Sequence, residues 1–116
     1  MRRISAFLTL STPFLLAGCH SHYIQATVTN HSGADVNVVQ VEYPGATFGT
    51  QRIVNSGNFH YRFKLLGTGQ LKLTWTDASH QDHTLNGPNL NEGQEGTLTI
   101  DFPSQSQATF QTDLHP

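Results

Sequence analysis

Two short runs of alternating residues, FHYRFKL (Phe59–Leu65) and LKLTWTD (Leu71–Asp77), decide the fold class of this chain. In both runs every second residue is apolar, and polar or charged residues stand between them. A period of two is typical of a β-strand that buries one face. The short loop GTG, residues 67–69, lies between the runs and predicts that they form a β-hairpin.

The same alternation extends over most of the chain after Tyr23 and indicates six to eight short strands. In VNVVQVEY, Val36–Tyr43, the apolar phase slips by one residue near Val38 and Val39, which predicts a β-bulge. Pro44 and Gly45 then give a turn signal. The residues expected to face the core are Ile24, Ala26, Val28, Phe59, Tyr61, Phe63, Leu65, Leu71, Leu73, Trp75, Leu98, Ile100 and Phe102.

These strands predict an all-β fold, a small antiparallel β-sandwich that is immunoglobulin-like or similar, with a small barrel as the alternative. The chain has 116 residues, enough for one domain. We assign residues 23–103 to the sandwich and residues 104–116 to a C-terminal tail or edge strand. Charged residues are only 12% of the chain, which also favours β-structure with polar strand faces over surface helices.

The N-terminal segment reads as an export signal. Arg2 and Arg3 precede an uncharged run, Ile4–Gly18, which is too short and too interrupted for a comfortable membrane span. We therefore expect residues 1–18 to be a signal peptide.

The stretch Leu16–Cys19 (LAGC) resembles the lipobox of bacterial lipoproteins. This resemblance implies that Cys19 carries a covalent diacylglycerol and that the signal peptidase cuts between Gly18 and Cys19. Residues 19–22 would then form a lipidated tether. An ordinary secretory signal that leaves a free thiol is the alternative.

The lipoprotein resemblance also implies a location. Several acyl chains hold a protein on a bilayer, because each buried methylene adds about 0.8 kcal/mol. His20 occupies the position after the cysteine where an Asp favours retention in the inner membrane of Gram-negative bacteria, so the expected address is the outer membrane, facing the periplasm. The membrane is thus a partner through the lipid anchor, and no cofactor besides this lipid is expected.

The charge of the mature chain argues against nucleic acid as a partner. Without residues 1–18, four basic residues stand against eight acidic ones, which gives a net charge of −4. A polyanion would be repelled, and the sequence has no basic cluster with interleaved aromatic residues.

A group of possible metal ligands lies in SHQDH, where His80, Asp82 and His83 fall within four residues. On an extended strand neighbouring side chains alternate between faces, so only a turn would gather all three. The other interpretation is a hairpin loop in which His80 occupies a left-handed position, which histidine tolerates. A metal-binding module that uses these residues, with His60 as a further ligand, is the alternative function.

No catalytic motif stands out, and the chain's one cysteine is used for the lipid, so we do not expect an enzyme. Trp75, Tyr43 and Tyr61 are interpreted as core residues and not as a platform for sugars. The mature part also resembles small bacterial β-sandwich lipoproteins of unassigned function. We therefore predict a binding or structural module with a protein partner in the envelope, contacted by edge-strand pairing or by loops around Asn30 and Asn86.

Overall fold

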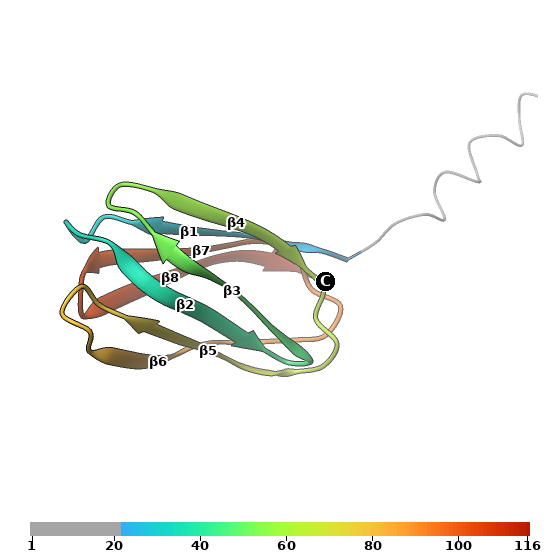
Figure 1. Cartoon of the computed structure of the whole chain (residues 1–116). Coiled ribbons are helices and arrows are strands. Elements are labelled where there is room, and N and C mark those ends of the chain that lie inside the picture. The colour runs from blue at the N-terminus through green and yellow to red at the C-terminus, as the bar shows by residue number, and fades with distance from the viewer. Residues whose placement is uncertain (1–21) are drawn as a thin grey trace, which may run out of the picture.

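The computed structural model describes residues 22–116, which form two four-stranded β-sheets packed face to face as a sandwich (Figure 1). In this part of the chain no helix is long and apolar enough to cross a membrane. The strands are β1 (Ile24–Asn30), β2 (Val36–Tyr43), β3 (Ala46–Ile53), β4 (Asn58–Phe63), β5 (Gly69–Thr76), β6 (Asp82–Leu90), β7 (Glu95–Ser104) and β8 (Gln107–His115).

One sheet has the strand order β4-β1-β7-β8 and the other has β3-β2-β5-β6. Every neighbouring pair is antiparallel except β1 and β7, which run parallel. The sandwich prediction is confirmed, with this one parallel pair added. Residues 104–116 were predicted to be a tail or an edge strand, and residues 107–115 form β8 at the edge of the first sheet.

The core consists of the inward side chains of both sheets. Alternation placed most of them correctly, because Ile24, Leu73 and Phe102 are each fully buried. Phe59 is only partly buried, and Tyr61 is 41% exposed. Its ring stacks on Phe48 of β3 with centroids 4.5 Å apart, at the side where β4 and β3 approach each other from different sheets.

The predicted hairpin between Phe59–Leu65 and Leu71–Asp77 is wrong. β4 pairs with β1, and β5 pairs with β2 and β6, so the two strands belong to opposite sheets. Leu65 is buried at this crossing, which carries the chain over the end of the core. An alternating pattern shows which face of a strand is buried, but it does not distinguish a hairpin from a crossing between sheets.

The predicted bulge is confirmed. The register between β2 and β5 shifts between Asn37 and Gln40, and Val38 has a positive φ of 47°. The turn signal is also confirmed, since Pro44 and Gly45 connect β2 to β3 and Gly45 has a φ of 105°. The chain reverses there because glycine adopts positive φ without a steric penalty.

The sandwich has two ends. At the entry end, where β1 begins, lie the β2–β3 turn and the segments 64–68 and 91–94 (Figure 1). At the far end lie the segments 31–35, 54–57, 77–81 and 105–106.

Asn30 and Gln105 close the far end with hydrogen bonds. The Asn30 side chain is fully buried and donates to the carbonyl oxygens of Ala34 and Ile53, at 2.8 and 2.9 Å. The Gln105 side chain donates to the Ser32 hydroxyl at 2.6 Å. Asn30 therefore holds the loop that follows it, in which His31 and Gly33 are exposed. Contact of this loop with a partner stays a prediction.

Candidate functional site

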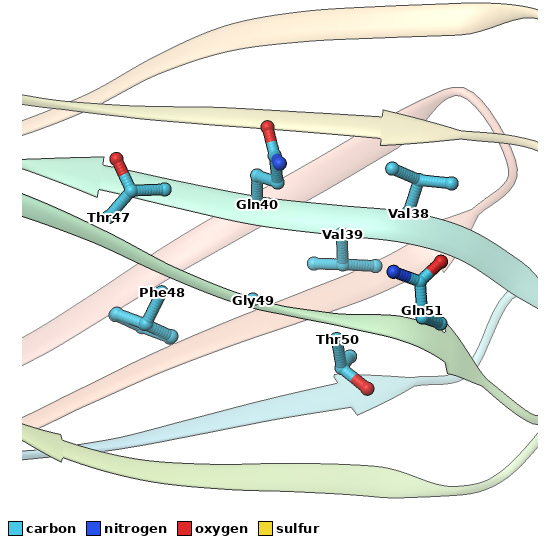
Figure 2. A pocket seen from close by; sticks show the side chains of 8 residues that line it. All are labelled: Val38, Val39, Gln40, Thr47, Phe48, Gly49, Thr50 and Gln51. Carbon is cyan, nitrogen blue, oxygen red and sulfur yellow. The ribbon is translucent and has the colours of Figure 1, made fainter.

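The outer surface of the β3-β2-β5-β6 sheet is hollowed around the bulge in β2. Three shallow depressions meet at Val38 in the part of the chain that the structure describes. Figure 2 shows that Val38, Gln40 and Thr47 point to one side of the strands, whereas Val39 and Phe48 point to the other. We call this surface the Val38 face, and its residues are Val38, Gln40, Thr47, Gly49, Gln51, Thr74 and Thr76.

Val38 is the unusual residue of this face. It is β-branched and has φ 47°, a left-handed conformation that costs such a residue free energy. Its side chain is nevertheless 46% exposed, so burial of the side chain does not offset the strain. Strain of this kind is concentrated at functional sites in proteins, which makes Val38 the first residue to consider.

Gly49 forms the floor beside the bulge. It pairs with Gln40 across the β2–β3 ladder, and a Cβ atom added at position 49 would collide with the carbonyl oxygen of Val39. The two strands approach closely here because no side chain separates them. The depression therefore depends on both the bulge and the glycine.

The chemistry of the face is uncharged at its centre. Amide groups of Gln40 and Gln51 and the hydroxyl groups of several threonines surround the exposed aliphatic Val38. The depression between β2 and β3 has no charged residue in its lining, whereas Arg52 and Asp82 each line one of the two others. A small apolar centre with a polar rim is the usual composition of a protein–protein contact.

The possible metal ligands line two of these depressions, and Asp82 and His83 have separate hydrogen-bond partners. Asp82 accepts a hydrogen bond from the Thr76 hydroxyl at 2.7 Å, and His83 Nε2 lies 2.8 Å from Asp77 Oδ2. His80 is exposed and has φ 66°, which confirms its expected left-handed position. Among residues 22–116 no group of three or more His, Cys, Asp or Glu side chains could hold a metal ion. Metal binding through His80, Asp82 and His83 stays a prediction.

Asp77 was missed by the sequence reasoning. Its buried carboxylate accepts hydrogen bonds from the backbone amides of Ser79 and Gln81, at 2.8 and 3.0 Å, and so fixes the β5–β6 loop. The hydrogen bond with His83, followed by the bond from Gln81, lowers the pKa of Asp77 below its ordinary value of 3.8. The available signal was an Asp two residues before a Ser after a strand, which is typical of a side chain that caps a turn.

The aromatic residues divide between core and surface. Trp75 is buried as expected, stacks with His83 at 5.0 Å, and donates its indole N–H to the carbonyl oxygen of Gln105 at 2.9 Å. Tyr43 is half-buried, and burial, followed by the proximity of Tyr61, raises the pKa of its hydroxyl. Trp75 also lines one of the three depressions at Val38, whereas Tyr43 and Tyr61 line none of them.

The expected contact loop at Asn86 is part of β6, since that strand continues through Gly87 and Pro88 to Leu90. The lipidation and cleavage positions, Cys19 and Gly18, lie outside the described residues.

Comparisons with known proteins support the fold alone. No family model matches this chain, and no curated protein matches it either. Among solved structures, the chain is similar to one described as an NMR structure of the protein from Eubacterium rectale. The TM-score is 0.57 at 11% sequence identity, and the match covers 78% of this chain and 88% of that one. At this identity the similarity extends to the β-sandwich and not to a function.

Proposed function

We propose that the protein is a lipid-anchored lipoprotein of the bacterial envelope and that its sandwich is a non-enzymatic module that binds a protein partner through the Val38 face. The LAGC stretch at Leu16–Cys19, behind an Arg-headed apolar run, supports the anchor. The first strand begins at Ile24, five residues after Cys19, so the whole sandwich follows the attachment point. The proposed address is the outer membrane, on its periplasmic side.

The observation that carries the binding role is the strained and exposed Val38. A bulge that served only to curve the sheet would be more stable with glycine or asparagine at this left-handed position. A valine there presents two methyl groups to solvent at the centre of a polar depression. A partner that covers these methyl groups would explain why the strain is tolerated.

The anchor can be tested by replacing Cys19 with Ser and feeding labelled fatty acid to cells. Wild type should incorporate the label and remain with the membranes, whereas the Cys19→Ser variant should do neither. Label in the variant, or a wild-type protein that fractionates as soluble in the periplasm, would overturn the lipid anchor.

The binding face can be tested by crosslinking in cells. A photoreactive residue in place of Thr74 lies on the Val38 face, and one in place of Thr99 lies on the outer face of the other sheet. Both threonines are partly buried strand residues, so Thr99 is a matched control. The proposal expects a discrete crosslinked protein, identified by mass spectrometry, from position 74 and not from position 99. Equal products from both positions, or a product from position 99 alone, would refute it.

A further inference from the structure

The entry end of the sandwich has a composition that differs from that of the far end. Tyr23, the residue before β1, is 38% exposed, and the Arg62 guanidinium lies 4.4 Å from the centre of its ring. Leu66, in the crossing between the sheets, is 64% exposed. Lys64 is exposed two residues before it. Two large apolar side chains and two cations therefore occur together at this end.

Leu66 is held in its exposed position by the neighbouring turn. Its backbone N–H donates to the carbonyl oxygen of Pro44 at 3.3 Å, and its side chain occupies the space that a Cβ at Gly45 would need. The Leu66 side chain thus packs on the β2–β3 turn. Its outer surface faces away from the core.

The chain that leaves this end is short. Four residue steps separate Tyr23 from Cys19, and an extended chain spans at most roughly 3.6 Å per residue, or about 14 Å in all. If Cys19 carries acyl chains in the bilayer, the entry end stays within this distance of the lipid surface. The far end, a sandwich length away, has no such restriction (Figure 1).

We propose that the group Tyr23, Arg62, Lys64 and Leu66 is a membrane-contact surface that rests on the phospholipid headgroups. This inference rests on the proposed lipid anchor. Tyrosine is enriched where a protein crosses the headgroup level, and exposed leucine gains from burial at the acyl boundary. Arg62 and Lys64 meet anionic lipids, at about 1 kcal/mol for each cation near the surface.

Acidic residues also occur at this end, and two of them define the limits of the surface. Glu95 lies 3.1 Å from His22 and 3.9 Å from His115, so histidines face this carboxylate. Glu92 is exposed in the segment 91–94, where its backbone N–H is bonded to the Thr68 hydroxyl. The cations are on β4 and directly after it, whereas these acids are at and before the start of β7. The contact is therefore expected around β4 and Leu66, with Glu92 at its border beside Thr68.

This contact surface would fix the orientation of the sandwich relative to the membrane. With the entry end on the membrane, the far end points into the periplasm and the Val38 face stands along the side of the module, open to a partner.

Site-directed fluorescence on the acylated full protein tests this orientation. Acylation removes the thiol of Cys19, the chain's one cysteine, so Leu66→Cys and Val54→Cys each supply a unique thiol for an environment-sensitive fluorophore. Val54 is 54% exposed at the far end and is the matched control. In vesicles of phosphatidylethanolamine and phosphatidylglycerol that contain a headgroup-level spin-labelled lipid, the label at position 66 should be quenched and the label at position 54 should not.

Charge variants give a second readout. In the Leu66→Cys protein, Lys64→Glu should reduce the quenching, and Arg52→Glu, a cation at the far end, should leave it unchanged. Equal quenching at positions 66 and 54, or no quenching at position 66 in a protein that sediments with the vesicles, overturns the contact surface and leaves the anchor standing. A wild-type protein that keeps a free Cys19 thiol and does not sediment overturns the anchor itself.

Discussion

The Nε2 atom of His83 lies 2.8 Å from the Oδ2 atom of Asp77, and this pair connects the first residue after β5 with the second residue of β6. The His83 ring also stacks on Trp75, so the pair covers the edge of the core at the far end. The other oxygen of Asp77 accepts two backbone amides of the loop between the strands. Asp77 therefore couples the loop conformation to its own ionisation.

We predict that Asp77→Asn lowers the stability at neutral pH and that this loss becomes smaller in acid. The hydrogen bond from His83 and those from the loop amides lower the pKa of Asp77 in the folded state. A lowered carboxyl pKa contributes stability that is complete above the unfolded value of 3.8 and is lost as the pH falls through the folded value. Urea unfolding followed by the fluorescence of Trp75, the chain's one tryptophan, measures the difference at pH 7, 5, 3 and 2.

Asp113→Asn is the control for this experiment, because Asp113 is an exposed residue of edge strand β8. The free energy of unfolding of the Asp113→Asn variant should equal that of wild type at each pH. A difference between wild type and Asp77→Asn that stays constant from pH 7 to pH 2 would contradict the role of Asp77.

The Val38→Gly substitution is predicted to stabilise the fold and to remove the contact with the partner. Glycine adopts φ 47° without the steric cost that a β-branched residue has there, so the free energy of unfolding should rise by about 1 kcal/mol. Val54→Gly is the control, because Val54 is a comparably exposed valine without positive φ and glycine there should destabilise. Chemical denaturation measures whether the free energy of unfolding of each variant is higher or lower than that of wild type. Partner crosslinking from position 74 should be lost in the Val38→Gly protein, and crosslinking at the wild-type level would show that this side chain is not the contact.

Gly49→Ala is predicted to destabilise the protein by about 1–3 kcal/mol, because its methyl group would collide with backbone atoms that cannot move aside as a side chain can. The atom in the way is the carbonyl oxygen of Val39, next to the bulge. Gly67→Ala is the matched control, since the nearest side-chain atom would be 3.7 Å away and Gly67 has no positive φ. Thermal unfolding should show a lower Tm for the first variant and little change for the second. The opposite order would mean that the β2–β3 pair adjusts to the methyl group without cost.

Strand positions and buried faces could be predicted because they depend on local alternation. Residues 24–30 and 97–102 alternate strictly, and the structure buries the expected side of each. The pairing partners could not be predicted in this way. β1 is hydrogen-bonded to β4 on one side and to β7 on the other. These strands are far from β1 in the sequence, and a local pattern does not show which distant strands pair. The hairpin error has the same origin, since Phe63 and Leu71 are close in sequence but belong to different sheets.

The candidate site was predictable only in part. The phase slip at Val38 and Val39 located the bulge, because an extra residue is the simplest way to keep two apolar phases on one face. It did not predict that Val38 would take the left-handed conformation, or that Gly49 on the neighbouring strand would complete the depression. The burial of Asn30 was not predicted, because the Asn-His-Ser-Gly segment is typical of a turn, and the hydrogen bonds of this side chain to Ile53 and Val54 join residues more than twenty positions apart.

Asn30→Ala is predicted to cost at least about 2 kcal/mol of stability, because it leaves buried backbone groups without their partner. The side chain donates to the carbonyl oxygens of Ala34 and Ile53 and accepts from the amide and hydroxyl of Ser32. Asn58→Ala, at an exposed position of β4, should change the stability by no more than about 0.5 kcal/mol. A loss equally small in the Asn30 variant would mean that water replaces the amide without cost.

Asn30→Asp separates the donor function of this side chain from its size. A carboxylate keeps the acceptor for Ser32 but points negative oxygen at the carbonyl groups of Ala34 and Ile53, where the amide nitrogen donated. Burial and this repulsion both favour the protonated acid, which restores one donor, so the pKa of the new carboxyl group should be raised. A raised carboxyl pKa means that the folded state binds more protons than the unfolded state, so the deficit relative to wild type should be large at pH 7 and smaller at pH 4. Urea unfolding at these two pH values measures the difference in free energy of unfolding between the Asn30→Asp variant and wild type. A deficit that is the same at both would show that the asparagine is needed for its shape and not as a hydrogen-bond donor to the far-end carbonyl groups.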